Sequence, residues 1–152
     1  VRMPLPRELK RMRFSGEKLY AVRFPGMVHL IREGPELERE AAEALLRDAA
    51  ERLNEPAAGL LQWRQETGGM TPLIWVRDSG TLVWETACGS GTAAIACLLS
   101  VLRNRSVRVS VSQPGGTLCA ETVLKDGEIQ EIRLSGRVCI GREETLLLPP
   151  PA

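Results

Sequence analysis

Histidine and aromatic residues are scarce in this sequence, which contains one histidine, one tyrosine and two phenylalanines among its 152 residues. A metal site built from several histidines is therefore excluded, and a cysteine–histidine zinc site is disfavoured. The sequence contains four cysteines, Cys88, Cys97, Cys119 and Cys139. They are too few for a disulfide-stabilised scaffold, and no two of them form a CxxC pair. We expect these thiols to be reduced, which favours a cytoplasmic protein.

An excess of charge and a long apolar run are also missing. The formal net charge is +1, which gives no reason to expect a nucleic acid or an anionic membrane as a partner. The longest apolar run, residues 92–102, is too short to span a membrane, and the first residues lack the apolar stretch of a signal peptide. The hydrophobic content of 43% is sufficient for one domain or for one half of a larger protein.

The patterns predict mostly strands and two helices. We expect an extended entry segment over residues 1–16 and strands over 17–24, 27–31, 59–63, 72–76, 81–85, 107–111, 117–124, 129–134 and 137–140. Apolar residues at helical spacing predict an amphipathic surface helix over about 35–54, and the helix over about 88–102 is apolar on nearly all sides, which predicts burial. We therefore expect residues 1–152 to form a single α+β domain, a mostly antiparallel β shell around the buried helix.

The chemical signal lies at the start of the buried helix, in the sequence Cys88-Gly89-Ser90-Gly91. A thiol at a helix N-terminus is expected to be stabilised as the thiolate by the helix dipole and the free backbone amides. Gly89 and Gly91 remove side chains from the first turn, so an anion can approach those amides. A buried structural cysteine is the alternative. A phosphate loop is disfavoured because its lysine is missing.

Two reactions suit a functional Cys88. Acyl transfer requires a base near the thiolate, for which His29 is the candidate. Proton abstraction from a carbon acid requires a weakly basic thiolate and donors to the adjoining carboxylate, which the amides of Gly89 and Ser90 supply. The residues favour carbon-acid chemistry. A non-catalytic domain that binds a small carboxylate stays open as an alternative.

Three segments resemble the diaminopimelate epimerase family of cofactor-independent amino-acid racemases and epimerases. Residues 85–94 (ETACGSGTAA) resemble its second cysteine motif, and residues 25–29 (PGMVH) resemble its Gly-Asn-Pro-His segment. Residues 109–118, with Gln-Pro-Gly-Gly, resemble its downstream strand and Pro-Gly-Gly turn. Together the matches cover the C-terminal half of the family. The resemblance implies a diaminopimelate-epimerase-like domain whose partner, the N-terminal half of the enzyme, is absent from this chain.

The resemblance also implies a two-base mechanism without pyridoxal phosphate or a metal, in which two thiols face the α-carbon from opposite sides. Cys88 corresponds to one thiol, and the other belongs to the N-terminal half. The residues implied to bind the amino-acid substrate are Gly89 and Ser90, through their amides, with His29, Glu85 and Thr86 around them. We expect Cys97, Cys119 and Cys139 to be structural.

Two departures from the family pattern concern the substrate. The positions that correspond to the Glu-Arg-Gly of diaminopimelate epimerases lie near Asp78-Ser79-Gly80 and differ from it. The Asn-Pro-His of the family is replaced by Met-Val-His at residues 27–29. The cysteine motif is closer to the divergent branch that resembles the histidine racemases of metallophore pathways. We therefore expect histidine or a related amino acid, with an authentic diaminopimelate epimerase fragment as the alternative. A homodimer is compatible with these features, and the sequence leaves the oligomeric state open.

Overall fold

The computed structural model describes residues 1–145, which form one mixed sheet and two helices. The elements are β1 (Glu8–Phe14), β2 (Glu17–Phe24), β3 (Met27–Glu33), α1 (Arg39–Leu53), β4 (Ala57–Arg64), β5 (Gly69–Val76), β6 (Thr81–Trp84), α2 (Gly89–Arg103), β7 (Arg108–Gln113), β8 (Gly116–Lys125) and β9 (Glu128–Gly136). The strand order is β1-β2-β3-β4-β5-β7-β8-β9, with β6 paired to β5. Antiparallel pairs dominate, and the parallel pairs are β3–β4 and β5–β7.

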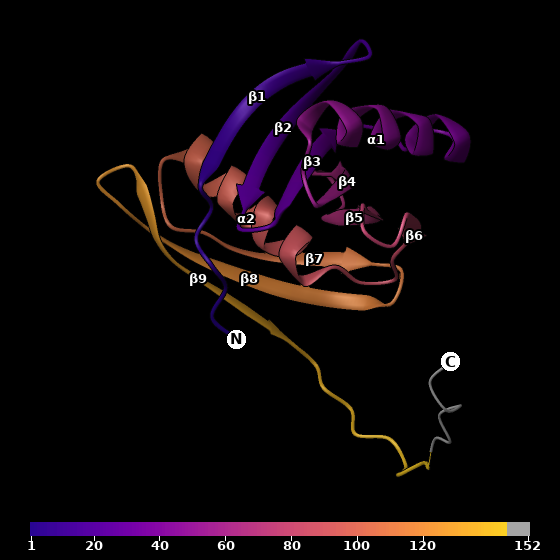
Figure 1. Ribbon diagram of the computed structural model, residues 1–152. Helices are drawn as coiled ribbons and strands as arrows, with labels where there is room; N and C mark the ends of the chain where they lie inside the picture. Colours follow the sequence, from indigo (N-terminus) through magenta and orange to yellow (C-terminus); the bar gives the residue numbers. More distant parts are fainter. Residues whose placement is uncertain (146–152) are drawn as a thin grey trace.

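The sheet curls around α2, so that this helix lies between two groups of strands (Figure 1). One side of α2 packs on β2–β5, and the other side packs on β7–β9. Alternate residues of β2–β5 point the other way and pack against α1. The layers are therefore α1, the strands β1–β6, α2 and the strands β7–β9. This arrangement confirms an α+β domain with a buried central helix and a second, amphipathic helix on its surface.

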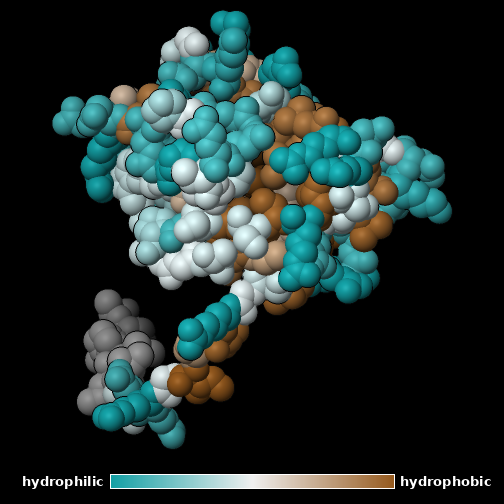
Figure 2. Space-filling view, turned by 180° about the vertical axis from the view of Figure 1, so that it is seen from behind, coloured by the Kyte–Doolittle hydropathy of each residue, from teal (hydrophilic) through white to brown (hydrophobic). Residues whose placement is uncertain are grey.

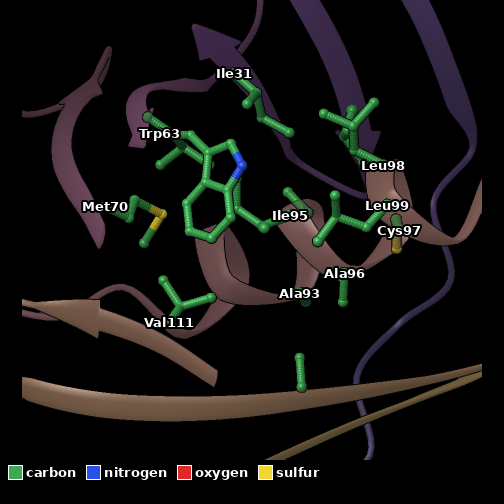
Figure 3. Close-up of a cluster of buried hydrophobic side chains, with 14 of the residues drawn as sticks. Ile31, Trp63, Met70, Ala93, Ile95, Ala96, Cys97, Leu98, Leu99 and Val111 are labelled. Carbon is green, nitrogen blue, oxygen red and sulfur yellow. The ribbon is translucent and has the colours of Figure 1, made fainter. Parts of the chain in front are cut away.

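The core around α2 fixes the position of the helix. Residues 91–100 of α2 are all buried, as its apolar composition predicts. Figure 3 shows the indole of Trp63 lying between Met70 of β5 and Ile95 of α2. Each fully buried aliphatic or methionine side chain of this core, such as Ile95 or Met70, stabilises the fold by about 1.5–3 kcal/mol. The N-terminal turn of α2, where the cysteine motif lies, is consequently held against the sheet.

The N-terminal segment is more ordered than the extended entry segment expected for residues 1–16. Residues 8–14 form β1, which pairs with β2 through a tight turn at Ser15 and Gly16, both with positive φ. Residues 1–3 pair with residues 132–134 of β9 and cover that edge of the sheet. The basic side chains of β1 are typical of an edge strand, which explains why the sequence showed no clear alternation there.

Helix α1 begins at Arg39 rather than at residue 35. The amide of Leu37 donates to Oε1 of Gln62 at 2.7 Å, and the carboxylate of Glu36 accepts from Arg64. These contacts hold the residues before Arg39 against the sheet in a non-helical conformation. Neither α1 nor α2, the helices of the described residues, has the length and apolar character needed to cross a membrane.

The strand expected over residues 137–140 is not formed. This segment leaves the body of the protein after β9 and carries apolar side chains into solvent, as Figure 2 shows. Val138 is 85% exposed and Ile140 is 96% exposed. A strand requires a hydrogen-bonded neighbour, and none lies beside residues 137–140 in the described part of the chain. The leucine run at 146–148 lies outside the described residues.

Candidate functional site

Cys88 lies at the N-cap of α2, where the loop from β6 enters the helix in an extended conformation (φ −127°, ψ 108°). Its side chain is 5% exposed. A Cβ atom on Gly91 would lie 2.9 Å from Cδ2 of Leu61 and 3.3 Å from Sγ of Cys88. Glycine at position 91 thus allows the first turn of the helix to pack closely on β4 beside the thiol.

Ser90 connects the thiol to the single histidine. Its Oγ lies 2.9 Å from Nε2 of His29 and 3.6 Å from Sγ of Cys88. Val28 and Leu30 of β3 face α1, so His29 between them faces α2 and the start of that helix. The structure therefore brings His29, Ser90 and Cys88 into one cluster, although His29 and Ser90 are separated by 61 positions in the sequence.

His29 is neutral in this cluster, because complete burial lowers its pKa to about 4. Its Nδ1 has no hydrogen-bond partner among the described residues. We assign the ring proton to Nε2, because an unpaired buried lone pair costs less than an unpaired buried N–H. In this tautomer His29 donates to Oγ of Ser90, and the hydroxyl of Ser90 has two sulfur acceptors, Sγ of Cys88 at 3.6 Å and Sδ of Met27 at 3.7 Å.

The thiol of Cys88 is protonated at neutral pH. Its pKa is raised to about 11, mainly by burial and to a smaller extent by the carboxylate of Glu85, whereas the Ser90 hydroxyl and the Gly91 amide lower it. The amide of Gly91 at the helix N-terminus favours the thiolate as expected, but burial has the larger effect, so the expected net stabilisation of the thiolate is wrong for this structure. In this state Cys88 is suited to delivering a proton.

The other predicted residues surround the cluster. Gly89 and Ser90 form the first turn of α2, where backbone amides have no acceptor within the helix. Gly89 lies against β9, since a Cβ on it would come within 2.9 Å of Cδ2 of Leu134. Thr86 is exposed, and its carbonyl accepts the amide of Gly115 at 2.7 Å. Thr86 thus joins the site to the turn between β7 and β8.

The remaining cysteines are dispersed and free. Cys97 is buried within α2, Cys119 is half-buried on β8, and Cys139 is exposed. Within residues 1–145, no three histidine, cysteine, aspartate or glutamate side chains gather closely enough to hold a metal ion. The structural role expected for Cys97, Cys119 and Cys139 stays a prediction.

Sequence reasoning missed two buried polar residues that contact Cys88. Oε1 of Gln113 accepts the backbone amide of Cys88 at 2.6 Å, and the hydroxyl of Thr92 donates to its carbonyl at 2.8 Å. A signal for Gln113 was present, because the alternation that turns Val109 and Val111 inward also turns Gln113 inward. A polar side chain at such a position needs a buried partner.

Comparison with known proteins identifies the family. Residues 1–146 match the family model described as the histidine racemase CntK N-terminal domain. The chain belongs to this family. A histidine racemase of Fusobacterium nucleatum subsp. nucleatum is 28% identical over 150 residues, which cover 93% of this chain and 56% of that protein. A histidine racemase of Staphylococcus aureus is 31% identical over 77 residues, which cover 50% of this chain and 28% of that protein.

Membership of the histidine racemase family confirms the relation to histidine racemases predicted from the cysteine motif. The closer placement with diaminopimelate epimerases stays a prediction. The chain spans about half the length of the curated relatives it matches. The family description names an N-terminal domain, whereas the motifs resemble the C-terminal half of diaminopimelate epimerases. The assignment of the chain to a C-terminal half therefore also stays a prediction.

Proposed function

We propose that this chain supplies one half of a cofactor-independent amino-acid racemase in which Cys88 is one of two acid/base thiols. Racemisation requires removal of the α-proton on one face of the substrate and return of a proton on the other face. The histidine racemase relatives support this reaction class. The observation that carries the proposal is the meeting of Cys88, Ser90 and His29 at the first turn of α2.

The first turn of α2 provides the site for the substrate carboxylate. The amides of Gly89 and Ser90 point out of the helix N-terminus, where the helix dipole favours a negative charge. Donors in this position also stabilise the charge that develops on the carboxylate when the α-proton leaves. Thr86 and Glu85 border this turn along the loop that enters it.

The proton on Cys88 completes the reaction in one direction. A thiolate on the opposite face removes the α-proton, and the carbanion then takes the proton from Sγ of Cys88. A C–H bond forms as the S–H bond breaks, which leaves Cys88 as the thiolate. The hydroxyl of Ser90, which is held by His29, stabilises that thiolate by donating to it. In the reverse direction the same thiolate removes the α-proton of the product enantiomer.

The second thiol must come from outside the first turn of α2. The other cysteines of the described residues do not join the Cys88 cluster, since Cys97 is buried in α2, Cys119 lies on β8 and Cys139 is exposed after β9. We assign the second thiol to the other half of the enzyme, which the relatives' length leaves room for. We assign histidine as the substrate because the relatives are named histidine racemases.

Racemisation of L-histidine by the full-length protein that carries this chain tests the proposal. Chiral chromatography should show D-histidine formed by the wild type, and Cys88→Ser should lower the rate by about 10²–10⁴, the usual contribution of an acid/base group. Cys97→Ser removes a buried thiol of the same helix and should retain the activity. Wild-type rates in Cys88→Ser would contradict the role of Cys88. Turnover of diaminopimelate instead of histidine would assign the alternative substrate.

A further inference from the structure

We propose that Gln113 is a positioning residue that fixes Cys88 in its reacting position. Gln113 is the last residue of β7 and is buried, 25 positions from Cys88 in the sequence. Its side chain touches the backbone of Cys88 and reaches α2 through Thr92. The significance of this position rests on the proposed function, in which Cys88 exchanges a proton with the substrate.

Gln113, Thr92 and Cys88 form a closed ring of hydrogen bonds. The amide of Cys88 donates to Oε1 of Gln113 at 2.6 Å, Nε2 of Gln113 donates to Oγ1 of Thr92 at 3.0 Å, and that hydroxyl donates to the carbonyl of Cys88 at 2.8 Å. The direction of every bond is fixed, because a backbone amide can only donate and a carbonyl can only accept. The ring therefore specifies a glutamine amide in one orientation.

The ring leaves the chemically active groups of the site free. An N-cap side chain commonly accepts an amide of the first helical turn, but Cys88 makes no such bond. Gln113 and Thr92 bind both backbone groups of Cys88 instead. The thiol is thereby held in place without being used as a cap, and the amides of Gly89 and Ser90 stay available to a carboxylate.

A second contact from the same hairpin holds the loop before Cys88. The amide of Gly115, in the turn between β7 and β8, donates to the carbonyl of Thr86 at 2.7 Å. A Cβ on Gly115 would lie 3.0 Å from Cβ and 3.1 Å from the carbonyl oxygen of Thr86, so the two backbones meet closely. The β7–β8 hairpin thus fixes the loop between β6 and α2 at two points, positions 86 and 88.

Gln113→Met tests the positioning role, with Gln62→Met as the matched control. Gln62 is also a buried glutamine whose Oε1 accepts a backbone amide, that of Leu37 at 2.7 Å, and it does not contact Cys88. Both variants should lose thermal stability. The rate at which iodoacetamide alkylates Cys88 would be followed by peptide mass spectrometry. We expect this rate to be about tenfold faster than in the wild type in Gln113→Met and unchanged in Gln62→Met. A tenfold change corresponds to about 1.4 kcal/mol of easier local opening. Equal rates in the two variants would overturn the proposal.

Gln113→Glu gives an independent test that does not depend on loosening the fold. A protonated glutamate can make the same ring. The ionised form cannot donate to Thr92, but it still accepts the amide of Cys88, and Thr92 still donates to the carbonyl of Cys88. Cys88 therefore stays held, while the negative charge beside it opposes its thiolate. The ratio of the alkylation rate of Gln113→Glu to that of the wild type should be near one at acidic pH. It should fall about tenfold as the glutamate ionises, because raising the thiol pKa by about one lowers the thiolate fraction about tenfold. A constant ratio from about pH 6 to about pH 9.5 would contradict the proposed contact.

The alkylation tests fail separately from the proposed function, because alkylation requires no turnover. Racemisation that survives Cys88→Ser overturns the proposed function and leaves the alkylation results unchanged. Equal alkylation in Gln113→Met and Gln62→Met overturns the positioning role and leaves the function of Cys88 standing. In the racemase assay, Gln113→Met should lower kcat with little change in KM, because the carboxylate donors of Gly89 and Ser90 stay in place.

Discussion

Replacing Gly59 with alanine is expected to displace His29 from its contact with Ser90. Gly59 of β4 lies directly beside His29 of β3 in the parallel register. A Cβ on Gly59 would lie 2.5 Å from Nδ1 and 2.9 Å from Cε1 of His29, and 2.8 Å from Cδ1 of Ile74. An ordinary contact is about 3.5 Å, so the imidazole must move by about 1 Å. A shift of that size moves Nε2 of His29 out of its 2.9 Å hydrogen bond with Oγ of Ser90.

The expected loss of stability combines two effects. Overpacking of a closed core costs about 1–3 kcal/mol, and loss of a buried hydrogen bond costs about 1 kcal/mol more. The backbone of Gly59 has no positive φ, so alanine adds no conformational strain there. We therefore expect Gly59→Ala to lower the free energy of unfolding by about 2–4 kcal/mol, which lowers Tm by roughly 5–15 °C for a chain of this size.

Urea unfolding of Gly59→Ala and of a control, Gly69→Ala, checks this magnitude. Gly69 is also a buried strand glycine, but its new Cβ would meet the far ends of side chains that can shift, Nη2 of Arg64 at 2.8 Å and Oγ1 of Thr67 at 3.1 Å. Gly69→Ala should therefore cost less than about 1 kcal/mol. In a His29→Ala background, Gly59→Ala should cost clearly less, because the clashing ring is gone and only the contact with Cδ1 of Ile74 remains. An equal cost with and without His29 would refute the packing explanation.

Two pH effects follow from the buried titratable groups. The folded pKa of Cys88 is about 11 against an ordinary 9.0, so the unfolded chain releases this proton first and stability falls as the pH rises through that interval. Urea unfolding should show a shallower fall in Cys88→Ala, and a fall that is unchanged by this substitution would contradict the assignment. The folded pKa of His29 is about 4 against an ordinary 6.5, so stability should fall as the pH drops from 6.5 toward 4. His29→Gln should remove part of that acid sensitivity, which the same measurement would detect.

Local patterns were sufficient for most elements of the fold. The predicted strand over 17–24 coincides with β2, and the predicted buried helix differs from α2 by one residue at each end. Both segments combine a clear apolar period with turn or glycine signals at their ends. Local alternation could not reveal whether a neighbouring strand exists. Residues 8–14 form a strand because β2 lies beside them, and residues 137–140 do not because no strand of residues 1–145 lies beside them.

The candidate site was only partly predictable for the same reason. The Cys-Gly-Ser-Gly sequence locates the start of α2, but the contact between Ser90 and His29 depends on how β3 lies against that helix. A lowered pKa of Cys88 was predicted from the helix N-terminus, which is a local feature. The strands that cover α2 determine its burial, and burial is the larger effect on the thiol. Gln113 acquires its partners through the same non-local packing.

The most direct test of Cys88 is the exchange of the substrate α-proton with solvent, followed separately for the two enantiomers. The full-length protein would be incubated in D₂O with L-histidine or with D-histidine, and early loss of the α-proton signal would be followed by NMR. The wild type should exchange both enantiomers. Cys88→Ser should exchange one enantiomer, served by the opposite thiol, and should not exchange the other. Exchange of both enantiomers by Cys88→Ser at wild-type rates would contradict the proposed role of this thiol.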